Sequence, residues 1–177
     1  MEIALEGPQV FVGRGGKRYV LREFQMKDLN AVVSINRRVL PENYPEWFFV
    51  EHFVSFPKAF IVAEMDGELV GYMMNRVEFG WSNIHKGKTA RKGHVVSIGV
   101  LPHARRLGIA TNMMIRGMKA MKRFYEADEV YLEVRVSNEP AISLYRKLGY
   151  EITGRIPRYY SDGEDAYIMS RTLADYA

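Results

Sequence analysis

The sequence predicts a mixed α/β domain with about seven strands and four helices, the helices lying on both faces of one sheet. Apolar residues recur at strand and helix spacings in the order β-α-α-β-β-β-α-β-α-β-β. A strand–helix–strand succession across residues 94–136 indicates a parallel pair with a right-handed crossover, because parallel strands need a long connection. The remaining strands can pair antiparallel.

The amino-terminal part predicts a tail, a strand and two helices. Residues 1–16 contain glycine and proline without a periodic pattern, so we expect an appended tail, followed by the domain over residues 17–177. A strand is predicted over residues 19–23. Residues 26–40 predict a helix that ends at a proline, since proline blocks helix continuation. A second helix should begin at a proline and run through about residues 45–54.

The middle of the chain predicts a hairpin and then a long loop. Residues 58–65 and 68–79 predict two strands joined by a tight Asp-Gly turn. Residues 80–92 resemble a polar loop, longer than a sheet connection needs, with basic residues Lys86, Lys88, Arg91 and Lys92. This loop could be a mobile cover, an RNA contact or an insertion.

The second half of the chain carries the predicted parallel pair. Residues 94–101 and 129–136 predict strands on either side of an amphipathic helix over residues 107–124. Ser137 or Asn138 can cap the next helix. The chain then predicts the end of that helix at Gly149 and two last strands, over residues 150–156 and 166–172.

A short basic loop precedes the helix over residues 107–124 and suits a pyrophosphate. It contains Arg105, Arg106 and Gly108. Backbone N–H groups at a helix start are unpaired, and the helix dipole favours negative charge there. Arginine adds fixed positive charge, and glycine lets the backbone approach the anion.

Two segments resemble the GNAT superfamily of N-acetyltransferases. The hexapeptide over residues 105–110 fits an acyl-CoA pyrophosphate motif, Gln/Arg-x-x-Gly-x-Gly/Ala, and residues 131–145 resemble a second CoA-side block. Three further segments, over residues 40–45, 93–97 and 163–167, are similar to the catalytic subunit of N-terminal (Nα) acetyltransferases in its archaeal form. The resemblance covers about residues 19–173, with the blocks in the family's order.

This resemblance implies acetyl-CoA as cosubstrate and two central parallel strands that splay apart to admit the pantetheine arm. Backbone groups at residues 98–100 would bind the pantetheine and polarise the thioester carbonyl. The residues that the resemblance assigns to the cosubstrate are Ile98, Gly99, Val100, Arg105, Arg106, Leu107, Gly108, Ile109, Ala110, Thr111, Asn138, Ser143 and Tyr145. The same residues also fit a solvated basic loop, a buried strand and a plain helix cap.

The resemblance assigns the chemistry to His94, Glu133 and Tyr145. A neutral amine must attack the thioester, so a base with a pKa near the working pH is needed, and histidine or glutamate can supply it. His94 and Glu133 would act as this base through an ordered water, and Tyr145 would protonate the departing thiolate. An edge histidine, a paired carboxylate and a packed tyrosine are the alternatives. No catalytic metal is expected, since two ligands could hold only an incidental Zn²⁺.

The substrate side is assigned, again by resemblance, to two loops. Glu42 and Tyr44 lie in the first, and Tyr159 and Tyr160 lie in the second. Glu42 would face the first residue of a peptide, and the tyrosines would bond its backbone. Aromatic loops that merely cover an edge of the core are the alternative.

Composition bounds the remaining possibilities. The absence of cysteine excludes disulfides, thiolate metal sites and a cysteine acyl-enzyme, so acetyl transfer would occur by direct attack in a ternary complex. A net charge of +4 suits CoA or loose association with ribosomal RNA, and is too small to indicate a dedicated nucleic-acid site. With no long apolar run and no secretory signal, a cytoplasmic protein with no membrane partner is expected.

The sequence therefore predicts transfer of acetyl from acetyl-CoA to the α-amino group of protein N-termini, of the Ser, Ala or Met type. One alternative is a lysine or small-amine acetyltransferase. A non-enzymatic alternative is a CoA-binding or ribosome-docking module. The preferred first residue, the oligomeric state and the need for an auxiliary subunit stay open.

Overall fold

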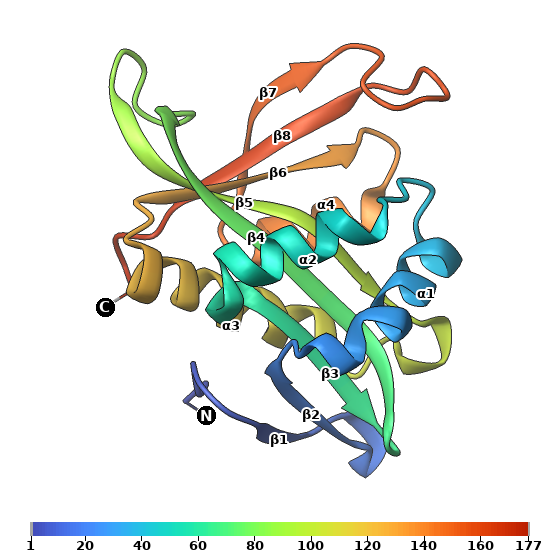
Figure 1. Ribbon diagram of the computed structural model, residues 1–177. Coiled ribbons are helices and arrows are strands. Elements are labelled where there is room, and N and C mark those ends of the chain that lie inside the picture. Colours follow the sequence, from blue (N-terminus) through green and yellow to red (C-terminus); the bar gives the residue numbers. More distant parts are fainter. Residues whose placement is uncertain (1, 177) are drawn as a thin grey trace.

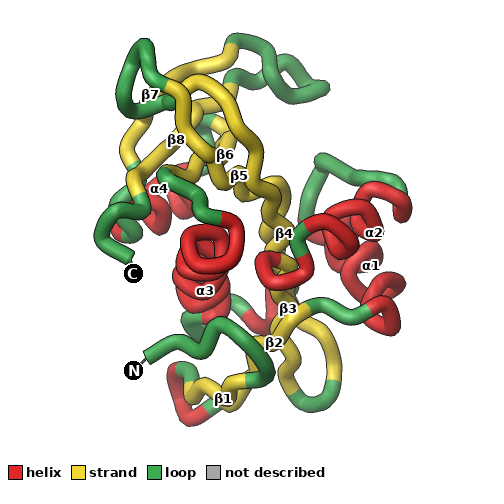
Figure 2. The backbone as a smooth tube through the Cα atoms, turned by 60° about the vertical axis from the view of Figure 1, so that its left-hand side comes forward, coloured by secondary structure: helices red, strands yellow, loops and turns green. Residues whose placement is uncertain are grey.

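The computed structural model describes residues 2–176, in which one eight-stranded mixed sheet separates two layers of helices (Figure 1, Figure 2). The first layer holds α1 (Leu29–Val39) and α2 (Glu46–Ser55), and the second α3 (Ile109–Tyr125) and α4 (Glu139–Lys147). The strands are β1 (Gln9–Val12), β2 (Arg18–Glu23), β3 (Phe60–Met65), β4 (Glu68–Trp81), β5 (Thr89–Val100), β6 (Glu129–Arg135), β7 (Glu151–Ile156) and β8 (Ala166–Thr172). The predicted mixed α/β class is confirmed, with eight strands against the expected seven.

The strands follow the order β1-β2-β3-β4-β5-β6-β8-β7, and every neighbouring pair is antiparallel except β5 and β6. The parallel pair meets only at its start, where Lys92, Gly93 and His94 pair with Glu129, Val130 and Tyr131. Beyond His94 the two strands have no further pairing. The predicted parallel pair and its splay are therefore confirmed.

The amino-terminal segment departs from its prediction. The prediction of an appended tail over residues 1–16 is wrong for residues 9–12, which form β1 and pair antiparallel with β2. Phe11 is buried and stacks on Tyr19 with ring centroids 5.4 Å apart, while Val10 and Val12 point to solvent. These four residues form a strand because the edge of β2 is available for pairing. The sequence did not predict the strand because it is short and lies between glycines.

The long loop predicted over residues 80–92 is also wrong. Strands β4 and β5 continue their pairing outward as far as Trp81 and Thr89, leaving only residues 82–88 as the turn. This turn is anchored by buried Glu129 of β6, which accepts hydrogen bonds from the Ser82 hydroxyl and, at 2.8 Å, the Asn83 amide. The sequence did not reveal these outer parts of β4 and β5 because the hairpin extends beyond the core, so both of its faces carry polar residues.

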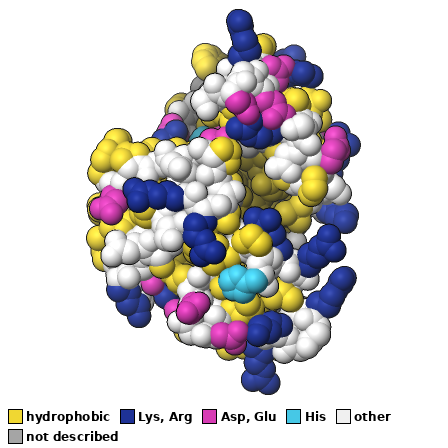
Figure 3. Space-filling view, turned by 90° about the vertical axis from the view of Figure 1, so that its right-hand side faces the viewer, with side chains coloured by type: hydrophobic (Ala, Val, Ile, Leu, Met, Phe, Trp, Pro, Cys, Tyr) yellow, Lys and Arg dark blue, Asp and Glu magenta, His cyan; other side chains and the backbone are white. Residues whose placement is uncertain are grey.

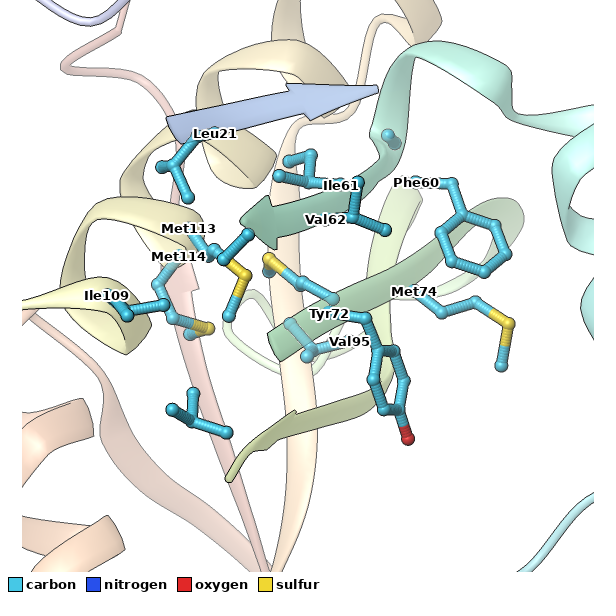
Figure 4. Close-up of a cluster of buried hydrophobic side chains, with 14 of the residues drawn as sticks. Leu21, Phe60, Ile61, Val62, Tyr72, Met74, Val95, Ile109, Met113 and Met114 are labelled. Carbon is cyan, nitrogen blue, oxygen red and sulfur yellow. The ribbon is translucent and has the colours of Figure 1, made fainter. Parts of the chain in front are cut away.

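The main core lies between α3 and the central strands. Figure 4 shows Leu21 and Ile61 from the sheet lying around Met113 of α3. At Gly117 of α3 an added Cβ would lie 2.6 Å from the Met73 sulfur. A larger side chain at this position would therefore force the buried Met73 side chain to move. Among residues 2–176, no helix has the length and apolar content needed to cross a membrane.

Buried tyrosines predict loss of stability in alkali. Burial raises the pKa of Tyr72 and of Tyr145 to about 12. An unfolded tyrosine ionises near pH ~10, so between pH 10 and 12 the unfolded chain releases protons that the folded chain keeps, and stability falls with rising pH. We expect each ring to contribute on the order of 2 kcal/mol to this loss. Urea unfolding at pH 8, 10 and 11 measures it, and Tyr72→Phe should flatten the decline; an unchanged slope contradicts the assignment.

Candidate active site

A cleft of about 840 Å³ opens where β5 and β6 separate. Its walls come from the α1–α2 loop, β5, the start of α3, β6, the start of α4 and the β7–β8 loop. Figure 3 looks onto this side of the molecule, where apolar side chains lie in a hollow between charged groups. This volume falls within the range of small-molecule and cofactor sites.

At one end of the cleft lies the predicted pyrophosphate loop. The Nε of Arg105 donates to the Val100 carbonyl at 3.0 Å, and Arg106 and Gly108 adopt left-handed backbone conformations with φ of 64° and 90°. Gly108 is the N-cap of α3, which begins at Ile109, two residues after its prediction, and no side chain caps the helix. The first amides of α3 are thus left for an anion, with two arginines beside them.

Most of the residues assigned to the cosubstrate meet in this cleft. Leu107 and Ser143 do not line it: Leu107 is half-buried against the β1–β2 side, and Ser143 is exposed on α4. Asn138 lines the cleft, but its side-chain oxygen caps α4 by accepting from the Ala141 amide at 3.3 Å. The residues that do line it are Ile98, Gly99, Val100, Arg105, Arg106, Gly108, Ile109, Ala110, Thr111, Asn138 and Tyr145.

The β5 wall presents backbone groups to the cleft. Pairing with β4 shifts register between Ser97 and Val95, so Val96 is an extra residue that bulges from the strand. Past His94, β5 has no strand partner on the β6 side within residues 2–176. Backbone donors and acceptors on this edge can bind an extended ligand that carries amide groups.

The His94 and Glu133 side chains meet deeper in the site. His94 Nε2 lies 2.7 and 2.9 Å from the two Glu133 carboxylate oxygens, and the ring stacks on Tyr131 at 4.3 Å. Glu133 lines the cleft, whereas His94 lies behind it with its Nδ1 buried and unpaired. The carboxylate is therefore the member of the pair that faces the cleft, and the imidazole is hydrogen-bonded to it from behind. No three potential ligands among residues 2–176 gather closely enough to hold a metal ion.

Four tyrosines, Tyr44, Tyr145, Tyr159 and Tyr160, line the cleft. The Tyr159 hydroxyl lies 3.4 Å from a Glu133 oxygen, and burial followed by the Glu133 charge raises the pKa of Tyr159 to about 12. The Tyr44 hydroxyl lies 3.4 Å from the carbonyl of the bulged Val96. Tyr145 lines the cleft from α4, and burial keeps its phenol protonated well past neutral pH.

Sequence reasoning missed Arg135, which joins the two substrate loops. Its guanidinium contacts Glu42 of the first loop at 2.9 Å, and Asp162 and Glu164 of the second at 2.8 and 3.0 Å. The guanidinium carbon also lies 4.1 Å from the Tyr160 ring centroid. The position of Arg135 on the same strand face as Glu133 was the available signal, since residues two apart share a face.

Asn36 was also missed. This fully buried amide donates to the Glu42 carbonyl at 3.0 Å and to the Tyr72 hydroxyl at 3.1 Å, and its oxygen lies 3.3 Å from the Tyr44 amide. Tyr72 in turn lies 2.6 Å from the Ser97 hydroxyl of β5. The α1–α2 loop is thereby tied to the strand that forms the cleft wall. A polar residue within the apolar stripe of α1 was the signal in the sequence.

A cleft between splayed parallel strands, with an uncapped helix start at one end and Glu133 of the His94–Glu133 pair on its wall, defines an acyl-CoA-dependent acyltransferase. Residues 29–150 match the model of the Acetyltransferase (GNAT) family, and the chain belongs to this family.

Relatives and solved structures agree with this placement. The chain is 55% identical to the N-alpha-acetyltransferase of Sulfurisphaera tokodaii over 89% of its length and 95% of that protein. It is 39% identical to the N-terminal acetyltransferase A complex catalytic subunit NAA10 of Arabidopsis thaliana, over 86% of this chain and 77% of the relative. The crystal structure of Ard1 from Thermoplasma volcanium superposes with a TM-score of 0.75 at 29% identity, covering 89% and 99% of the two chains.

Tyr145→Phe tests the tyrosine that the family resemblance assigns to protonation of the departing thiolate. Since the ring stays and only the proton donor goes, we expect kcat to fall about 100-fold while the Kd for acetyl-CoA stays within about twofold. Stopped-time assays give kcat, and calorimetry gives Kd. Because the pKa of Tyr145 is raised to about 12, its ionisation should not lower wild-type kcat between pH 8 and 10. If affinity falls in step with rate, Tyr145 is a packing residue.

Proposed function

We propose that the protein transfers the acetyl group of acetyl-CoA to the α-amino group of protein N-termini, by direct attack within a ternary complex. One observation carries this proposal: a single cleft connects the uncapped start of α3 to the Glu133 carboxylate. A diphosphate held at Gly108 to Thr111 would direct a pantetheine arm along the free edge of β5. The thioester would then reach Glu133, beside the two substrate loops.

Each residue has a role in this proposal. Glu133 accepts the amine proton, directly or through water, and His94 shares that proton through its hydrogen bond to the carboxylate. Tyr145 donates a proton to the departing thiolate. Backbone amides near the Val96 bulge stabilise the oxyanion that develops on the thioester carbonyl. Residues 17–177 form the catalytic domain, and β1 adds an edge strand to it.

Two arguments support an α-amine as the acceptor: the low pKa of an α-ammonium group and the residues that surround the cleft mouth. A free α-amine has a pKa near ~8, against ~10.4 for lysine, so a single carboxylate base suffices near neutral pH. Glu42, Tyr44, Tyr159 and Tyr160 surround the point where the amine would enter, and Arg135 holds both loops closed around it. The similar Arabidopsis thaliana Naa50, with a TM-score of 0.73 and 25% identity over 87% of this chain and 98% of its own, was solved with the bisubstrate analogue CoA-Ac-MVNAL.

The test uses peptides that offer one amine each. Peptides beginning with Ser, Ala or Met-Glu and lacking lysine are incubated with acetyl-CoA, and the products are read by mass. Matched peptides with a formylated first residue and one internal lysine serve as controls. We expect acetylation of the free N-termini only. Acetylation of the lysine peptides at an equal or higher rate would establish the lysine alternative instead, and binding of CoA without any product would support a non-enzymatic module.

Glu42→Val tests the specificity loop. Replacing this carboxylate with an apolar side chain should shift the kcat/KM ratio between Met- and Ser-starting peptides at least about fivefold toward Met, because one pocket contact contributes about 1–3 kcal/mol to discrimination. Competition between the two peptides measures the ratio directly. Acetyl-CoA affinity should not change. An unchanged peptide ranking would place the first residue elsewhere.

The cellular setting follows from the proposed substrate. Protein N-termini emerge during synthesis, so we propose that the enzyme acts in the cytoplasm and associates with ribosomes. The net charge of +4 supports attraction to RNA-rich surfaces.

A further inference from the structure

The outer end of the β4–β5 hairpin lies outside the cleft, whose lining includes none of its residues. We call residues 79–91 the hairpin tip. It stands out from the sheet at the upper left of Figure 1, while the loops of the cleft mouth lie at the right. Phe79 and Trp81 there are 71% and 70% exposed. Aromatic rings exposed to this extent on a projecting element indicate a binding surface.

The two rings lie in a row beside a cation. Phe79 and Trp81 are two residues apart on β4, so they point to the same face about 7 Å apart. Their partners on β5 are Arg91 and Thr89, whose side chains share that face. The Arg91 guanidinium is thus placed beside the aromatic row.

The charge of the hairpin tip has one sign. Residues 79–91 contain Lys86, Lys88 and Arg91 and no aspartate or glutamate. Lys86, Lys88 and Arg91 are exposed, and within residues 2–176 none of the three forms an ion pair. Such a surface attracts a polyanion.

The surface is also held in place. Buried Glu129 binds Ser82 and Asn83, and the Lys92 ammonium donates to the Asn83 side chain at 2.9 Å. A preformed surface loses less conformational entropy on binding than a loose loop does.

We propose that the hairpin tip binds RNA that carries unpaired bases. Exposed bases stack on aromatic rings regardless of sequence, and phosphates bind the neighbouring cations. A bilayer fits less well, because polar residues His85, Lys86 and Lys88 form the leading turn and the rings sit behind them on the strand. The proposal goes beyond acetyl transfer and does not depend on it. RNA bound here would leave the cleft mouth open, since the two lie on opposite sides of the molecule (Figure 1).

The experiment measures fluorescence anisotropy of a labelled oligouridine of about 16 nucleotides across a salt series, both without CoA and with saturating CoA. One variant carries Phe79→Ser and Trp81→Ser, and another carries Lys86→Gln, Lys88→Gln and Arg91→Gln. We expect the aromatic variant to bind at least about fivefold more weakly with the same salt slope. We expect the basic variant to lose about 2 from the slope of log K against log[salt], at ~0.7 per neutralised charge.

A matched control removes three unpaired, exposed basic residues from the far end of the molecule: Arg14→Gln, Arg18→Gln and Lys27→Gln. This control should bind oligouridine like the wild type. All variants should acetylate a Ser-starting peptide at the wild-type rate, which verifies folding. The proposal is overturned if either hairpin variant binds like the wild type, if CoA displaces the RNA, or if the protein binds phosphatidylserine vesicles and not oligouridine.

Discussion

Glu133→Gln is expected to lower kcat by about 10²- to 10⁴-fold, the usual contribution of a general base. The amide keeps the shape of the carboxylate and can still bond His94 Nε2, which now lies 2.7 Å from an oxygen of Glu133. What it loses is the ability to accept a proton from the attacking amine. The Kd for acetyl-CoA should stay within about twofold, because no charge near the diphosphate end has changed. Steady-state kinetics with a Ser-starting peptide and calorimetry with CoA separate these quantities.

A double-mutant cycle then assigns the role of His94. If His94 acts through the Glu133 carboxylate, His94→Ala should slow the wild type markedly but add little to Glu133→Gln, because residues that work as a unit are not additive. Glu78→Gln, an exposed carboxylate paired with Arg76, is the control and should keep full activity. Substantial activity in Glu133→Gln would remove this residue from the chemistry.

Arg135→Leu should have the second large effect. The change removes the cation that holds Glu42, Asp162 and Glu164 together and leaves three carboxylates that repel one another. Both substrate loops would open, so we expect kcat/KM for the peptide to fall about 10- to 100-fold, mostly through KM. Acetyl-CoA affinity should be unchanged, since the residues proposed to bind the cosubstrate lie on other walls of the cleft.

Arg155→Leu is the matched control for this change. Arg155 also binds a carboxylate near the second loop, Asp165 at 2.8 Å, but its side chain is 54% exposed and contacts neither Glu42 nor Glu164. An exposed pair contributes little, so the control should retain nearly all activity. Equal losses in the two variants would mean that loop charge in general, rather than the bridge at Arg135, maintains the site.

The sequence could predict the parts of the fold that local pattern determines. The strand–helix–strand unit across residues 94–136 follows from periodicity and from the geometry of parallel connections, and the structure has it. Strand β1 was missed because only one of its four residues, Phe11, is buried in the core, and the outer β4–β5 hairpin was missed because it extends beyond the core. Their formation depends on an open sheet edge and on Glu129, which are tertiary features.

The site divides in the same way. The basic loop before α3 could be singled out from its local pattern, the His94–Glu133 pair was assigned by resemblance to a family, and the structure brings the two into one region. The bridge from Arg135 to Glu42, Asp162 and Glu164 joins residues 93, 27 and 29 positions apart, so no local pattern contains it. The buried amide of Asn36 likewise gains its meaning only when α1 lies on β4.

The parting of β5 from β6 has a mechanical consequence. The sheet consists of two parts, β1 to β5 and β6 to β8. Three residue pairs between β5 and β6 join these parts at one end, and the two strands are not paired with each other along the rest of their length. A cosubstrate arm bound between β5 and β6 would take the place of a neighbouring strand. Its amide groups would form hydrogen bonds with the backbone groups of β5 that have no partner on the β6 side. Cosubstrate binding should therefore raise the thermal stability of the protein. Without the cosubstrate, the contact between β5 and β6 should be the first to separate on heating.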